Sequence, residues 1–214
     1  MRCENFEYQF FENVTMLGIF FDQETTGLDS RRHRVLDLAF MIVNLSTGEI
    51  VRSYSCLIQP SEETWQGRDP ISITINGIDF DEASTRGKSE EEVAAEVEEL
   101  FVRAKIKRGQ SVFICQNPSF DRQFFAQLID PYTQERLFWP YHWLDLASMF
   151  WATQVQQCIT ENKPIPVEMR LSKDMIAEAL GLPPEMRPHR ALQGVEHLLL
   201  CYRHLVGFPM ELKK

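Results

Sequence analysis

Residues 20 to 30 read FFDQETTGLDS and place two acidic residues, Asp22 and Glu24, directly after the apolar stretch MLGIF at residues 16 to 20. An apolar run of this kind is typical of a strand that enters the core of a protein. Burying an unpaired carboxylate costs several kcal/mol even after relaxation. We therefore expect a cation, a hydrogen-bonding partner or solvent beside the end of this strand.

The composition limits the kinds of partner that the chain can have. It has 22 Lys and Arg residues against 31 Asp and Glu residues, a net charge of −9, so broad electrostatic coating of nucleic acid or of an anionic membrane is excluded. Any contact with nucleic acid must be local or bridged by a cation. The five cysteines are an odd number, without metal-ligand spacing, which favours a reducing cytoplasm. The segment at 1–14 lacks an apolar signal core, and no stretch has the roughly 20 apolar residues of a membrane helix.

The hydrophobic pattern predicts an α/β protein. Three strands are expected first, then a loop with one helical turn, and then helices alternating with short strands. Strands are predicted at 14–22, 33–44, 50–60 and 111–117, and the loop at 62–83. Helices are predicted at 88–109, 118–130, 172–182 and 189–208, with a short strand leading into a helix over 141–157. With 44% hydrophobic residues and no repeats or linkers, the 214 residues are expected to form a single domain.

Two further carboxylates lie at junctions between strands and helices. Asp121 follows the predicted strand at 111–117, and Asp145 lies in WLDLA. Ligand sites in open α/β sheets form at such junctions, so distant carboxylates can meet there. Oxygen ligands of this kind suit Mg²⁺ or Mn²⁺ and metal-assisted attack on phosphate. The alternatives are a rim position for Asp22 and Glu24, a first-turn acid for Asp121 and, as the favoured interpretation, a helix cap for Asp145.

Three motifs resemble the DEDDh family of 3′–5′ exonucleases, which are DnaQ-like proteins with an RNase H-like fold. FDQETTGLD at 21–29 is similar to the first motif, QNPSFD at 116–121 to the second, and PHRAL at 188–192 to the start of the third. Together with ISITINGI at 71–78, the resemblance covers about residues 14–206. It implies one RNase H-like domain over 1–214, with a five-stranded mixed sheet flanked by helices and its first three strands antiparallel.

The resemblance also implies roles for individual residues. Asp22 would bridge two Mg²⁺ or Mn²⁺ ions, Glu24 would hold the first ion on the side of the attacking water, and Asp121 would hold the second. His189 would be the general base. Histidine side chains in general have a pKa near neutrality, which suits this task. The contacts to the terminal nucleotide would come from Thr25, Leu28 and, less directly, Asn76.

One position departs from the family pattern. Where the family has a fourth aspartate, five residues after the histidine, this chain has Gly194. Glu196 lies two positions further on, on a different side of a helix, so it cannot simply replace that aspartate. Water, or a carboxylate from elsewhere in the chain, would have to fill the place.

The sequence therefore predicts a metal-dependent 3′–5′ exonuclease that releases nucleoside monophosphates from single-stranded DNA or RNA ends by two-metal-ion hydrolysis. It would work in the cytoplasm, away from membranes, either alone or beside a polymerase, and a homodimer is a further alternative. The alternative, favoured by Gly194, is a catalytically impaired exonuclease-like binding or scaffold subunit. The intact first motif argues against this alternative, because buried carboxylates without a cation destabilise a fold.

Overall fold

The computed structural model of the protein describes residues 15–210. The acidic segment at 1–14, which lacks an apolar signal core, lies outside the described residues. Within residues 15–210 no helix has both the length and the apolar character needed to cross a membrane.

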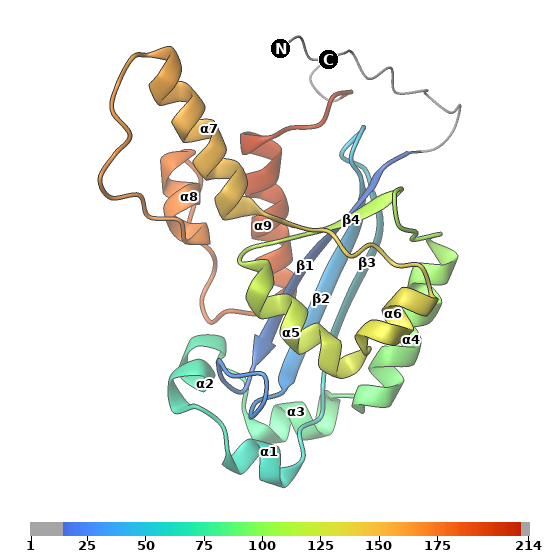
Figure 1. Ribbon diagram of the computed structural model, residues 1–214. Helices are drawn as coiled ribbons and strands as arrows, with labels where there is room; N and C mark the ends of the chain where they lie inside the picture. Colours follow the sequence, from blue (N-terminus) through green and yellow to red (C-terminus); the bar gives the residue numbers. More distant parts are fainter. Residues whose placement is uncertain (1–14, 211–214) are drawn as a thin grey trace.

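The centre of the fold is a five-stranded mixed sheet (Figure 1). Its order is β3-β2-β1-β4-β5, the first three strands pair antiparallel, and β4 and β5 continue parallel to β1. This confirms the predicted fold class. The strands are β1 (Leu17–Thr25), β2 (Val35–Asn44), β3 (Ile50–Leu57), β4 (Ser111–Cys115) and β5 (Trp143–Asp145).

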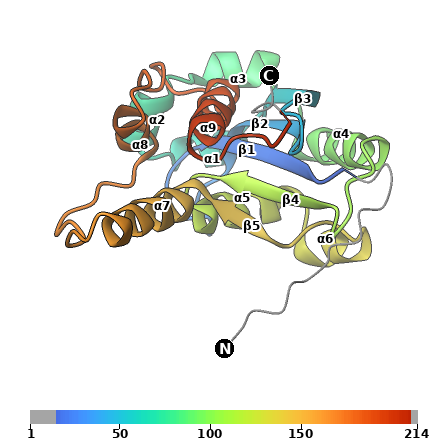
Figure 2. The same cartoon turned by 90° about the horizontal axis from the view of Figure 1, so that it is seen from above.

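Helices cover both faces of the sheet, with α9 on one face and α5 on the other (Figure 2). Alternation along β1 divides its apolar side chains between two cores. Ile19 and Phe21 pack in the core that includes side chains of α4 and α5, and Phe20 packs in the core formed with α7, α8 and α9. These helices are α4 (Glu90–Arg103), α5 (Pro118–Leu128), α7 (Leu146–Thr160), α8 (Lys173–Ala179) and α9 (Ala191–Leu205).

The prediction of a loop at 62–83 was wrong. Three short helices occupy this region, α1 (Glu62–Gln66), α2 (Pro70–Asn76) and α3 (Phe80–Arg86). Each begins at a capping side chain that accepts a hydrogen bond from a backbone N–H of the first turn, Ser61, Asp69 and Asp79 respectively. A further short helix, α6 (Pro131–Arg136), was also missed, and Asp130 caps it in the same way.

Candidate active site

The two carboxylates of the first motif lie within β1, not after it. The predicted strand ended at residue 22, but β1 continues to Thr25, and Asp22 and Glu24 pair with Ala39 and Asp37 of β2. On its other side β1 pairs with β4 only as far as Phe20. Because of strand alternation, Asp22 and Glu24 point to the same face as Phe20, the face covered by α9. The acids therefore occupy the part of β1 that extends beyond its parallel neighbour.

Asp121 reaches this place from α5. Asn117 adopts a left-handed conformation with φ of 58°, Pro118 opens the helix, and Asp121 lies in its first turn. The Gln23 side-chain amide donates a hydrogen bond of 2.9 Å to the Asp121 carbonyl, which ties α5 to β1. Asp121 is 3% exposed, so its carboxylate is inside the protein rather than on a solvated helix end.

His189 comes to the same site from the loop before α9. Its backbone N–H donates a 3.0 Å hydrogen bond to the Ile75 carbonyl of α2, which fixes the loop on that helix. Its Nε2 atom is buried and has no hydrogen-bond partner among residues 15–210. The chain thus brings the histidine and the three predicted carboxylates into one pocket. The residues that line it are Asp22, Gln23, Glu24, Gln116, Phe120, Asp121, Lys173, Glu185 and His189.

Crowding of these carboxylates alters their acidity. Burial raises the pKa of Asp22 from 3.8 to about 6, although the Lys173 ammonium acts in the opposite direction. Burial and then the charge of Asp22 raise the pKa of Glu24 from 4.5 to about 8. The pKa of Asp121 is raised well above its usual value by burial and by Asp22. All three ionised carboxylates are therefore held at a cost, which a bound cation would offset.

Lys173 and Glu185 belong to the pocket, although nothing in the sequence motifs pointed to them. Lys173 Nζ lies 2.9 Å from Glu185 Oε2 and 3.5 Å from Asp22 Oδ2, and it donates a 3.2 Å hydrogen bond to the Gly194 carbonyl. Burial opposes the charge on Lys173, but Asp22 and Glu185 outweigh it and raise its pKa. The ammonium thus offsets part of the negative charge of the pocket.

Gly194 faces this cluster from α9. A Cβ atom built at Gly194 would stand 1.7 Å from Asp22 Oδ2 and 3.0 Å from Glu185 Oε1. The space that a side chain would need is therefore filled by the carboxylate of Asp22, with that of Glu185 beside it. Glu196 is exposed, as its place on the helix predicts.

The three residues predicted to contact a nucleotide lie outside the lining of this pocket. Thr25 is buried at the end of β1, whereas Leu28 is 75% exposed in the following turn. The Asn76 side chain donates to the Thr25 carbonyl at 3.2 Å and accepts from the Ile78 N–H at 3.0 Å. Asn76 therefore links α2 to the end of β1, and the nucleotide contacts stay a prediction.

Two other acids have structural roles. Asp145 accepts hydrogen bonds from the backbone N–H groups of Ala147 and Ser148 and so caps α7, which confirms the favoured interpretation. Asp37 accepts a 3.0 Å hydrogen bond from the Ala191 N–H. This bond fixes the first residue of α9, two positions after His189.

The donor set fits a hard divalent cation. Asp22, Glu24 and Asp121 offer carboxylate oxygens, the ligands that Mg²⁺ and Mn²⁺ prefer in proteins. One oxygen of the nearby Glu185 is buried and has no hydrogen-bond partner among the described residues. A buried carboxylate oxygen without a partner, next to carboxyl groups whose pKa values are raised, is the arrangement expected of a cation site.

The stability of the metal-free protein should fall as the pH rises. Between about pH 5 and pH 8 the folded protein retains protons on Asp22 and Glu24 that the unfolded chain releases, because their pKa values are raised to about 6 and about 8. We expect Tm in EDTA to decrease by on the order of 5 °C across this range, and Mn²⁺ to reverse most of the loss at pH 8. Thermal unfolding at both pH values measures this, with Glu24→Gln as the variant that flattens the profile. An equal slope with and without Mn²⁺ would contradict it.

Known proteins resemble this chain over most of its length. A family model described as an exonuclease, RNase_T, matches residues 19–199. Ribonuclease T of Actinobacillus pleuropneumoniae is 30% identical over 152 residues, which cover 67% of this chain and 68% of that protein. The PolC-type DNA polymerase III of Thermotoga petrophila is 29% identical over 182 residues, 85% of this chain but only 11% of the polymerase.

A solved structure shares the fold. Exonuclease I of E. coli in complex with a dA16 oligonucleotide superimposes with a TM-score of 0.67 at 18% identity, over 89% of this chain and 40% of that one. The present chain thus spans about two fifths of exonuclease I. The sheet order and the flanking helices agree with the RNase H-like fold of that enzyme. From the family match across residues 19–199, we conclude that the chain belongs to the exonuclease family described by the RNase_T model.

Proposed function

We propose that the chain is a DEDDh-type 3′–5′ exonuclease that removes nucleoside monophosphates from single-stranded nucleic-acid ends. The observation that carries this proposal is the convergence of Asp22, Glu24, Asp121 and His189, from three separate segments, in one pocket. Family membership supports nuclease chemistry, and the acid cluster supports a metal-dependent form of it. The overall negative charge is no obstacle, since bound cations supply the positive charge next to the phosphate.

The proposed mechanism assigns a task to each side chain. Asp22, Glu24 and Asp121 would hold two divalent ions, Mg²⁺ or Mn²⁺, which when bound would stabilise the charge that develops on a phosphodiester during hydrolysis. Glu24 also orients the attacking water. His189 would accept the proton of that water at Nε2, an atom that is buried and has no hydrogen-bond partner in the part of the chain that the structure describes.

The polymer end would lie along the turn after β1. Thr25 and the exposed side chain of Leu28 would contact the terminal nucleotide, and Asn76 would hold the Thr25 backbone in place for it. We also propose that residues 1–214 act as one cytoplasmic domain. The match to part of a PolC-type polymerase supports work beside a polymerase, and a homodimer is the alternative assembly.

One observation favours a second function, that of a catalytically impaired binding subunit. The Lys173 ammonium already lies between carboxylates of Asp22 and Glu185, so a cation of the protein itself competes for part of the site. Such a subunit would bind single-stranded ends without shortening them. Binding of a labelled oligonucleotide together with absence of any cleavage product would identify this function.

A cleavage assay tests the proposal directly. With 5′-labelled single-stranded DNA and RNA and Mg²⁺ or Mn²⁺, we expect a ladder of products shortened from the 3′ end. EDTA should reduce the rate by at least about a hundredfold, because the proposed chemistry depends on the ions. A circular single-stranded substrate is the control and should stay intact. Cleavage of the circle would show internal cleavage, and absence of a ladder under all conditions would overturn the exonuclease proposal.

A further inference from the structure

The loop between α8 and α9 places the Glu185 carboxylate where the family pattern has an acidic side chain on α9. The position of a Cβ atom at Gly194 lies 3.0 Å from Glu185 Oε1. The Glu185 carboxylate therefore lies beside the position from which an acidic side chain on α9 would extend. The Glu185 side chain is only 4% exposed, so this placement belongs to the interior of the protein.

The two oxygens of Glu185 have different surroundings. Oε2 lies 2.9 Å from the Lys173 ammonium, whereas Oε1 is buried and, within residues 15–210, has no hydrogen-bond partner. Glu185 lines the same pocket as Asp22, Glu24 and Asp121. A buried carboxylate oxygen without a partner destabilises the protein unless something binds it. Lys173 thus holds one oxygen and leaves the other available to a cation.

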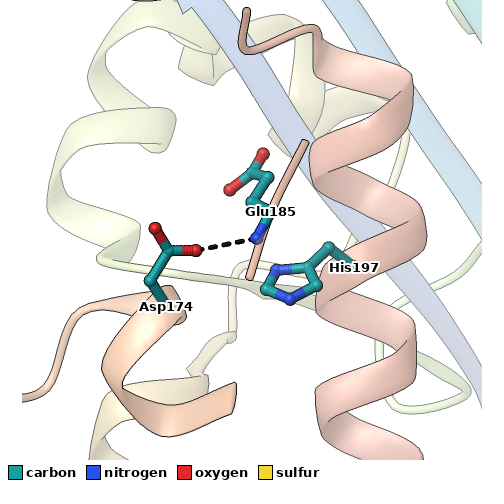
Figure 3. Close-up of side chains that lie close together, drawn as sticks. All are labelled: Asp174, Glu185 and His197. Atoms are coloured by element: carbon teal, nitrogen blue, oxygen red, sulfur yellow. Dashed lines mark hydrogen bonds between the residues drawn. The ribbon is translucent and has the colours of Figure 1, made fainter. Parts of the chain in front are cut away.

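Neighbouring side chains fix the loop in this orientation. Asp174 Oδ1 accepts a 2.9 Å hydrogen bond from the Glu185 N–H, and His197 Nε2 lies 2.9 Å from the Pro183 carbonyl. Ligand atoms of Asp174, Glu185 and His197 lie within 4.8 Å of one another, but Figure 3 shows the Glu185 carboxylate turned away from the His197 ring. We therefore interpret Asp174 and His197 as positioning residues, not as a metal site of their own.

We infer that Glu185 supplies the fourth carboxylate of the metal site, in place of the side chain that Gly194 lacks, and that Lys173 positions it. This inference rests on the proposed function and concerns the same pocket. It explains why α9 can carry glycine at this position while the other three carboxylates are kept: the set of four acids is completed from a loop.

Binding of Mn²⁺, measured by the electron paramagnetic resonance signal of the free ion, tests this inference without using activity. Glu185→Asp keeps the charge that pairs with Lys173 but withdraws the oxygen by one methylene, and we expect binding to weaken about tenfold or more. Glu178→Gln, an exposed position on α8, is the matched control and should bind like the parent. Unfolding in EDTA establishes that each variant is folded.

A second pair of variants separates a ligand from a counter-ion. In the Lys173→Met background no ammonium needs neutralising, so adding Glu185→Gln should still weaken Mn²⁺ binding about tenfold if Glu185 is a ligand. The double variant removes both members of a buried ion pair, a change that is often neutral for folding. Equal affinities of the single and double variants, together with unchanged binding by Glu185→Asp, would overturn the inference.

The outcome of a parallel titration of Asp22→Asn distinguishes this failure from failure of the proposed function. If Asp22→Asn loses Mn²⁺ while the Glu185 variants keep it, only the role of Glu185 is wrong. If Mn²⁺ binds neither the parent nor any variant, both the inference and the metal-dependent function are overturned.

Discussion

Asp22→Asn is expected to abolish 3′-end shortening while making the metal-free protein more stable. Asp22 is central to the pocket: it lies 3.5 Å from Lys173, and its charge raises the pKa of both Glu24 and Asp121. Loss of a group outside the ligand shell of a metal typically reduces activity 10- to 100-fold, so loss of a carboxylate that is proposed to hold the metal ions directly should reduce it by at least about a thousandfold. The ladder assay with equal amounts of both proteins measures this.

The same substitution is expected to lower activity but to raise the stability of the metal-free protein. Replacing the carboxylate by an amide of similar shape removes the ionisable group of one of the four carboxyl groups that lie together in this pocket beside Lys173. In EDTA at about pH 8 we expect Asp22→Asn to unfold a few degrees above the parent, equivalent to roughly 1 kcal/mol. Glu196→Gln, exposed on α9, removes a charge of the same sign outside the pocket and should change neither quantity. An inactive variant with lowered Tm would mean that Asp22 is mainly a structural acid.

Gly194→Ala should be strongly harmful, against the usual effect of this substitution. In a helix interior, alanine is more favourable than glycine by about 1 kcal/mol. Here the added Cβ would stand 1.7 Å from Asp22 Oδ2, so the carboxylate must leave its place. We expect a net destabilisation of about 1 to 3 kcal/mol, typical of overpacking, and a loss of activity of about a hundredfold or more because Asp22 is displaced.

Gly194→Asp tests the same contact in a stricter form. Although it recreates the family pattern in sequence, its side chain would enter space filled by Asp22 and Glu185, so we expect it to lower activity as well. Glu196→Ala on the same helix provides the control for helix propensity and should retain both activity and stability. Higher activity of Gly194→Asp than of the parent would show that Asp22 and Glu185 can move aside and that the glycine alone limits catalysis.

The sequence was sufficient to predict the sheet and to predict that Asp22 and Asp121 lie close together at its edge. Asp22 and Asp121 could be placed together because parallel strands such as β1 and β4 end at the same edge of a sheet, and a helix begins there. The short helices over 62–83 were missed because five to seven residues hold too little periodicity, even where a capping side chain marks each start.

The places of Lys173 and Glu185 in the pocket could not be predicted from the sequence, for a different reason. Lys173 opens a helix and Glu185 lies in the loop GLPPEMRP at 181–188, and neither position has a local pattern that indicates a site. Their meeting depends on long-range contacts, above all the bond from Glu185 N–H to Asp174 and the contact of Lys173 with the Gly194 carbonyl. The missing side chain at Gly194 was the single signal in the sequence that another residue would be needed there.

Helix α2 joins two parts of the site that are far apart in the chain. Its Ile75 carbonyl accepts a hydrogen bond from the His189 N–H, and its Asn76 side chain donates a hydrogen bond to the Thr25 carbonyl. One segment of seven residues therefore sets the spacing between the strand end proposed to hold a nucleotide and the histidine proposed to accept a proton. We therefore expect a substitution that loosens α2 to shift both ends at once, and so to change the KM and the kcat of the proposed reaction together.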